Sequence, residues 1–255
     1  MLPSIRTHLL FFCISVAAGL GGSSAAYATG PAEDSCLSES STPDSRIAAC
    51  TALMRSQLRA AKNSAVARVE ASILLSRAAA FGQKGEYAHA IADTTRVLNL
   101  APSPAAYYTR ALAYHNIGEN NRAIADCNAA LQIDPSDANA LFVRAASHQG
   151  KADYTKAIRD YTEVLQLEPD RADALFSRGA ARYSSGQYDR AVDDFTRTID
   201  LGAADGNVFY LRSLAYQELG RTANANADMT EALHRDPDLQ ERPPVRRSPT
   251  TTGQR

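Results

Sequence analysis

Among the charged residues of this chain, arginine and aspartate show the most regular spacing. Five arginines recur at nearly constant intervals, and an aspartate follows each of them at a fixed separation. The arginines are Arg77, Arg110, Arg144, Arg178 and Arg212, and the aspartates are Asp93, Asp126, Asp160, Asp194 and Asp228. A guanidinium and a carboxylate can form a bidentate ion pair. We therefore expect a structural ladder of Arg–Asp pairs; a row of arginines that grips an acidic partner is the functional alternative.

Patterns that carry catalysis or bind metals are absent from the sequence. It contains no glycine loop that would hold phosphate, no H-E-x-x-H and no G-x-S-x-G. His115 and His148 could meet in a repeat structure, but two histidines without a third ligand make a poor metal site. We expect no enzyme activity, no metal and no cofactor.

The N-terminal segment 1–28 has the pattern of a secretory signal peptide. Arg6 precedes an apolar run over residues 9–20, and Ala26-Tyr27-Ala28 forms a small-x-small cleavage site. The run is shorter than the roughly 20 apolar residues that span a bilayer. We expect cleavage near Ala28 and a periplasmic or secreted protein without a stable membrane span. A retained membrane anchor is the alternative.

Cleavage near Ala28 would remove Cys13 and leave three cysteines. Export would place these three in an oxidising compartment, where disulfides form. Cys36 and Cys50 lie close together in the chain, and we expect a disulfide between them that closes a loop of about 14 residues. Cys127 stands at an apolar position of its helix, with Leu131 one turn further on. We therefore expect Cys127 to be a buried free thiol.

Prolines mark a repeat period of about 34 residues. Pro102, Pro135 and Pro169 follow one another at single periods, and Pro237 comes two periods after Pro169. Small residues recur at the eighth position of each period and alanine at the twentieth, which lets helices approach closely. Each period contains a helix A, a turn and a helix B. The five repeats are 71–103, 104–137, 138–171, 172–205 and 206–239.

These recurring positions resemble the tetratricopeptide repeat family, over about two thirds of the chain. The resemblance implies an all-α fold, a right-handed α-solenoid of helix-turn-helix repeats. The ladder arginine takes position 7 and its aspartate position 23, so they can pair within a repeat or across two neighbouring repeats. Ala152 stands where the turn glycine of the third repeat belongs, but it does not interrupt the helical pattern.

Both ends of the repeat array depart from the pattern. Residues 29–43 are polar and loop-like, and we expect residues 29–70 to form a disulfide-stapled loop and a capping half-repeat. For residues 240–255, which include prolines and arginines, we expect a disordered tail. No obvious element covers the last helix B. Its exposed apolar residues, Met229, Ala232 and Leu233, predict either a contact surface or a frayed end.

The resemblance also implies a ligand site, because helices A line the concave groove in the family and present positions 2, 5, 9 and 12. Aromatic residues there provide contact area, and amides can hold a peptide backbone. The expected groove residues are Leu75, Tyr108, His115, Asn139, Phe142, Gln149, Phe176, Tyr183, Tyr210 and Gln217.

The expected function is therefore a scaffold for protein–protein interaction that binds a polypeptide in the concave groove. The alternatives are a structural or assembly factor, or a regulatory subunit of a cell-envelope complex. A formal net charge of −1 gives no electrostatic reason to expect a nucleic acid as partner. Self-association through the C-terminal repeat would follow from an uncovered last helix.

Overall fold

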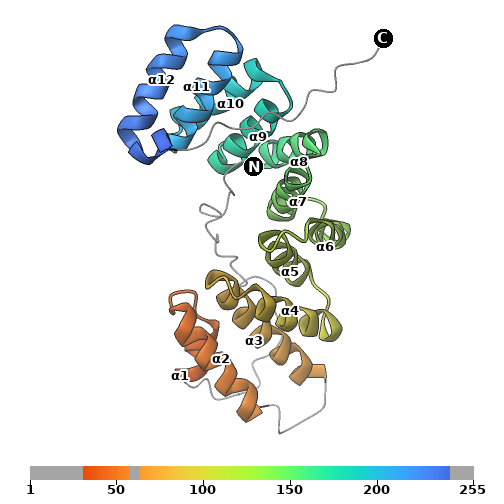
Figure 1. The fold of residues 1–255 in the computed structure, drawn as a ribbon. Helices are drawn as coiled ribbons and strands as arrows, with labels where there is room; N and C mark the ends of the chain where they lie inside the picture. Colours follow the sequence, from red (N-terminus) through yellow and green to blue (C-terminus); the bar gives the residue numbers. More distant parts are fainter. Residues whose placement is uncertain (1–30, 58–63, 242–255) are drawn as a thin grey trace. The chain divides into compact units, whose positions relative to one another are not determined.

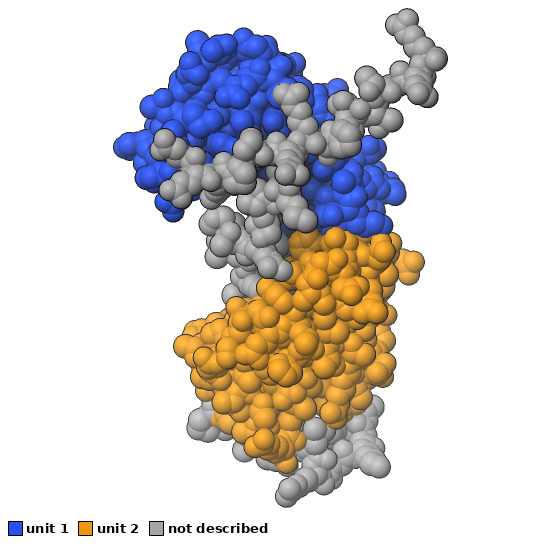
Figure 2. Space-filling model, viewed as in Figure 1, with its two compact units in different colours: residues 1–4, 136–255 blue, residues 5–135 orange. Residues whose placement is uncertain are grey.

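The described part of the chain is helical throughout (Figure 1), as the sequence predicts. The structure is a computed structural model that describes residues 31–57 and 64–241. These residues form twelve α-helices and one short 3-10 helix. They fall into two compact units, coloured in Figure 2: unit 2 ends at Pro135 and unit 1 begins at Ser136. The predicted signal peptide and residues 242–255 of the predicted tail lie outside the described residues.

Unit 2 contains three helical hairpins. Each helix packs against the next one in the sequence, and α3 also contacts α1 and α5. Leu74 of α3 and Val97 of α4 are buried in a core that includes Ala106 of α5. The hairpins are α1 (Pro31–Leu37) with α2 (Pro43–Gln57), α3 (Ser64–Gln83) with α4 (Tyr87–Leu100), and α5 (Pro104–Asn116) with α6 (Asn120–Ile133).

The N-terminal hairpin corrects one prediction. A loop was expected over residues 29–43, but Pro31–Leu37 forms a helix that packs on both α2 and α3. The polar composition of this segment hides its helical state, because Cys36 is the only buried residue at positions 32–43. The first element of the array is therefore a complete hairpin with a short helix A.

The predicted disulfide between Cys36 and Cys50 is confirmed, and it joins α1 to α2. Cys127 is buried and forms no disulfide with another described cysteine, also as predicted. Beside the short α1, Arg46 is only 6% exposed. Its Nη2 donates to two carbonyl groups in the turn between α1 and α2. This guanidinium satisfies backbone acceptors that a longer helix A would have bonded internally.

Unit 1 contains the other three hairpins and the 3-10 helix η1. Asp137 and Asp205 cap the first helices of two of these hairpins by accepting hydrogen bonds from backbone N–H groups. The hairpins are α7 (Ala138–Gly150) with α8 (Tyr154–Leu167), α9 (Ala172–Ser184) with α10 (Tyr188–Asp200), and α11 (Gly206–Glu218) with α12 (Thr222–Arg235), which η1 (Pro237–Glu241) follows.

The turns between helices A and B require one residue with positive φ. Gly118, Gly186 and Gly220 supply it, with φ between 70° and 82°. In the third repeat Ala152 takes the same conformation, with φ of 59°. The repeat therefore keeps its turn geometry without the glycine, at a cost of about 1 kcal/mol.

The C-terminal end corrects a second prediction. An uncovered last helix B was expected, but η1 packs against it. Leu239 of η1 is 3% exposed and contacts Phe209 and Ala232. Arg235 lies over the Phe209 ring, 4.7 Å from its centroid. The other apolar residues of this helix end, Met229 and Leu233, are half-buried.

None of the described helices combines the length and the apolar character that a membrane crossing requires.

Candidate binding surfaces

Each of the five regularly spaced arginines binds the aspartate of its own repeat. Nε and Nη2 of the guanidinium donate to the two carboxylate oxygens, at N–O distances of 2.6–3.1 Å. The pairs are Arg77–Asp93, Arg110–Asp126, Arg144–Asp160, Arg178–Asp194 and Arg212–Asp228. The ladder therefore joins helix A to helix B within each repeat.

The third nitrogen of the guanidinium connects four of these arginines to the preceding hairpin. Nη1 donates to a threonine hydroxyl on the preceding helix B, at 3.0–3.2 Å. Because Thr51 is one of these acceptors, α2 occupies the place of a helix B. One arginine thus holds three helices together. The pairs are Arg77–Thr51, Arg110–Thr95, Arg178–Thr162 and Arg212–Thr196.

The burial of these arginines determines whether a binding partner could reach them. Their side chains are only 14–19% exposed, and those of their aspartates 0–11%. The hydrogen bonds that Arg110 and Arg212 donate to Asp126 and Asp228 raise the pKa of both guanidinium groups. The geometry therefore favours the structural ladder over a row of arginines that grips an acidic partner.

The surface of unit 2 includes three of the predicted groove residues. Leu75, Tyr108 and His115 are half-buried. Burial lowers the pKa of His115, so its imidazole is held in the neutral form. A half-buried aromatic ring can still offer one face to a ligand, which suits Tyr108 to an apolar contact.

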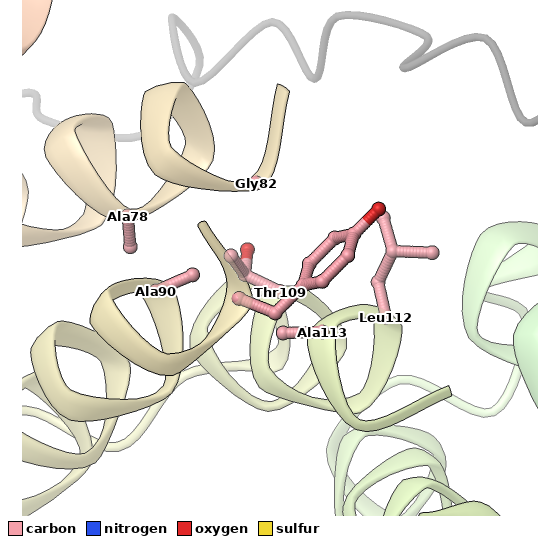
Figure 3. Close-up of a pocket in the computed structure, with 7 residues that line it drawn as sticks. Ala78, Gly82, Ala90, Thr109, Leu112 and Ala113 are labelled. Carbon is pink, nitrogen blue, oxygen red and sulfur yellow. The ribbon is translucent and has the colours of Figure 1, made fainter. Parts of the chain in front are cut away.

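A small recess lies between α3, α4 and α5 of unit 2 (Figure 3). Its volume is about 10 Å³, room for at most one water molecule. Small and apolar side chains dominate its lining: Ala78, Gly82, Tyr87, Ala90, Thr109, Leu112 and Ala113. It is a packing gap, and it cannot hold a substrate or cofactor.

Unit 1 carries the other seven predicted groove residues. Phe176 packs on Phe195 with their ring centroids 6.0 Å apart, and Tyr183 packs on Tyr188 at 5.5 Å. Asn139, Phe176, Tyr183 and Tyr210 are half-buried, and Gln217 is exposed. These five residues remain accessible to a ligand.

Two groove residues of unit 1 are buried, contrary to the prediction. Phe142 is 3% exposed, because Arg171 lies over its ring at 4.7 Å and Tyr161 packs against its edge. Gln149 is 8% exposed and accepts a hydrogen bond from the Tyr161 hydroxyl. Both side chains lie on α7 and contact Tyr161 of α8, so they help to pack these two helices together.

Arg171 was missed in the sequence, although it organises this surface. Its Nη1 donates to Asn139 and to Glu168, at 3.1 Å each, and its Nε donates to Asp173 at 2.8 Å. Ser103, Asp137 and Asp205 occupy the corresponding place before other helices A and cap them. The sequence did hold a signal for this role: an arginine stands at the N-cap position of α9, where other repeats have serine or aspartate.

No group of three or more histidine, cysteine or carboxylate side chains in the described ranges could hold a metal ion.

Comparison with protein families gives three matches that follow one another along the chain. The matching models, each described as Tetratricopeptide repeat, cover residues 104–137, 142–207 and 206–239. Together they span more than half of the sequence. No curated protein matches the chain.

Solved structures with a similar fold include a tetratricopeptide repeat protein from Parabacteroides merdae ATCC 43184. It has a TM-score of 0.61 and 22% identity, over 76% of this chain and 73% of that one. MamA from Desulfovibrio magneticus RS-1 has a TM-score of 0.61 and 16% identity, over 66% and 96% of the two chains. YrrB, described as a TPR protein with an unusual peptide-binding site, has a TM-score of 0.57 and 17% identity, over 66% and 87%. These similarities confirm the predicted fold class.

Proposed function

Because the chain belongs to the tetratricopeptide repeat family, over residues 104–239, we propose that it is a scaffold that binds a polypeptide on its helices A. The observation that carries the proposal is the set of half-buried aromatic rings on α9 and α11: Phe176, Tyr183 and Tyr210. Aromatic residues are enriched at protein–protein interfaces, and tyrosine is enriched among the residues that dominate binding energy.

The rings are held in place by the core behind them. Phe176 and Tyr210 pack against the cluster that contains Phe195 and Val208, so part of each side chain is already ordered before a ligand arrives. An ordered aromatic surface loses little conformational entropy when it binds. YrrB, which shares the fold, has a peptide-binding site. Both points support a polypeptide as the ligand.

The test is capture of partners from the source cell with the full chain and two variants. Phe176→Ala/Tyr210→Ala removes two rings from unit 1, and we expect it to lose the partners that the wild type retains. Leu167→Ala/Leu201→Ala is the matched control, since both leucines are exposed (47% and 39%) but lie at the ends of helices B. Equal capture by the wild type and the aromatic variant would refute this surface.

We also propose that the protein works outside the cytoplasm, in the periplasm or after secretion. The pattern of residues 1–28 supports this location, and so does the Cys36–Cys50 disulfide, because disulfides persist in oxidising compartments. Mass spectrometry of the protein from its native envelope fraction should give an N-terminus near residue 29. A full-length N-terminus in that fraction would favour the retained anchor.

A role as an assembly factor or as a regulatory subunit of a cell-envelope complex is the alternative proposal. It would use protein binding of the same kind, without catalysis by this chain. Self-association through the C-terminal repeat has less support now that Leu239 covers Ala232. Light scattering over a wide range of concentration separates these cases, because an assembling protein gains mass as concentration rises.

A further inference from the structure

One carboxylate in the ladder is shared by two arginines of the same helix. Asp194 accepts hydrogen bonds from Nε and Nη2 of Arg178, at 3.1 and 2.7 Å, and also from Nη1 of Arg182, at 2.8 Å. Arg182 stands one helical turn after the ladder arginine. Most other repeats have an aromatic residue at this position: Phe81, Tyr114 and Tyr216, with His148 in the third repeat.

A third arginine, Arg190, lies near this pair, and its own side-chain Nη1 donates to Oε1 of Gln187 at 3.2 Å. Nη1 of Arg182 also approaches the carbonyl oxygen of Arg190 on α10, at 3.4 Å. The neighbouring Asp189 is bound by Arg221, at 2.9 Å. Among the described residues, Asp193 on the same helix is exposed and forms no ion pair. The guanidinium groups of Arg178 and Arg182 thus share the single carboxylate of Asp194, so these three side chains together carry a net positive charge.

The donors of Arg182 are only partly used. Its Nε is buried without a hydrogen-bond partner, and its Nη2 makes no hydrogen bond to any described residue. Burial lowers the pKa of Arg182; the charge and hydrogen bond of Asp194 oppose this shift, while the charges of Arg178 and Arg190 add to it. The charged form is therefore less stable here than in water, and a nearby anion would relieve the repulsion.

We propose that Arg182 and Arg190 form a binding site for a carboxylate, at the turn between α9 and α10, and that the ligand is an acidic side chain of the bound polypeptide. Guanidinium groups bind carboxylates through charge-assisted hydrogen bonds, and Arg190 is exposed. This inference rests on the proposed polypeptide-binding function and names the partner more closely.

Aromatic residues next to the arginines favour a peptide over a free anion. Tyr183 follows Arg182 in α9, Tyr188 precedes Arg190 in α10, and the two rings pack 5.5 Å apart. A peptide with an acidic residue between apolar residues would contact the rings and the guanidinium groups together. The expected partner segment is therefore acidic and flanked by apolar side chains.

The direct test uses three fluorescein-labelled peptides and the full chain. They share the sequence Leu-Tyr-X-Tyr-Leu, where X is glutamate, glutamine or phosphoserine. By fluorescence anisotropy we expect the glutamate peptide to bind about tenfold more tightly than the glutamine peptide. This preference should vanish in Arg182→Tyr and in Arg190→Gln. Arg182→Tyr installs the residue that two other repeats carry at this position, so it should fold; its melting curve checks this.

Arg197→Gln is the matched control for net charge. Arg197 lies on the same helix α10, is 56% exposed and pairs with Asp170. This variant should keep the glutamate preference. Equal affinity for glutamate and glutamine in the wild type would overturn the proposal, as would a preference that survives Arg182→Tyr. Tighter binding of the phosphoserine peptide than of the glutamate peptide would overturn the carboxylate assignment.

A second measurement separates this inference from the proposed function. In an NMR titration with sodium acetate at constant ionic strength, the Nε–H signal of Arg182 should shift and saturate, and Arg190→Gln should weaken that response. A saturating response without any peptide binding would uphold the anion site and refute the polypeptide surface. Loss of peptide affinity in Phe176→Ala/Tyr210→Ala, with no difference between glutamate and glutamine, would uphold the surface and refute the site. A linear response shared by all arginines would count against the site.

Discussion

A side chain on Gly179 would collide with Phe195, since a Cβ placed there would lie 2.7 Å from Cε1 of the ring. Gly179 is the small residue at the eighth position of its repeat, and Phe195 is the large residue at the twenty-fourth. The ring is fully buried and so cannot move aside freely. Helices α9 and α10 depend on this absence of a side chain for their close approach.

Gly179→Ala should therefore destabilise the protein by about 1–3 kcal/mol, in spite of the better helix propensity of alanine. Urea denaturation followed by circular dichroism measures the change. A second substitution, Phe195→Leu, makes room for the new methyl group, so Gly179→Ala should cost less in that background. Equal costs in the two backgrounds would show that the collision is not the cause.

The ladder predicts a large difference between two arginines that touch the same aspartate. Asp160 is fully buried; Arg144 binds it with a side chain 16% exposed, and Arg159 with one 59% exposed. Arg144→Met should cost about 3–5 kcal/mol, because it removes a buried partner of a buried carboxylate. Arg159→Met should cost less than about 1 kcal/mol, because its charge is largely solvated. Similar melting temperatures for the two variants would contradict the structural ladder.

The disulfide predicts a local loss of stability on reduction. Cys36→Ser/Cys50→Ser should destabilise the N-terminal hairpin by about 3 kcal/mol, the loop-entropy value for a closed loop of about 15 residues. Hydrogen exchange of residues 31–57 should quicken in this variant and in the reduced wild type. The variant provides its own control, since a thiol reductant should not change its exchange further. Protection unaffected by reduction would show that packing alone holds α1.

Histidine titration predicts the pH dependence of unit 1. Burial lowers the pKa of His148 below its ordinary 6.5; Asp160 and Asp153 oppose the shift, while Lys156 and Arg144 add to it. The folded protein therefore keeps this imidazole neutral, while the unfolded chain takes up a proton near pH 6.5. Its contribution to stability is complete above that pH and is lost as the pH falls towards the folded value.

His148→Gln should accordingly flatten the decline in stability between about pH 7 and pH 5. The dependence of stability on pH will not vanish in this variant, because burial also lowers the pKa of His115. His89→Gln is a suitable control, since the His89 side chain is 67% exposed. Denaturant midpoints measured across this range give the slopes. A slope unchanged by His148→Gln would contradict the assignment.

The helical fold and the Arg–Asp register could both be read from the sequence. They depend on residues that recur once in every repeat, such as Arg178 and Asp194, and each recurrence repeats the same local packing. The disulfide was predictable as well, because Cys36 and Cys50 are close in the chain. Helix α1 was not predictable in this way, since it occurs once and Cys36, the only buried residue at positions 32–37, leaves almost no pattern.

The surfaces were decided by contacts between residues far apart in the sequence. Phe142 and Gln149 occupy positions that face a ligand in the family, yet Arg171 and Tyr161 cover them. Leu239 likewise closes an end that the sequence left open. By itself, the sequence determined the helices of the five repeats and the arginine and aspartate positions that pair between them, because those interactions repeat. Only the tertiary structure decided which side chains stay accessible, because burial depends on every neighbour, including those that break the repeat.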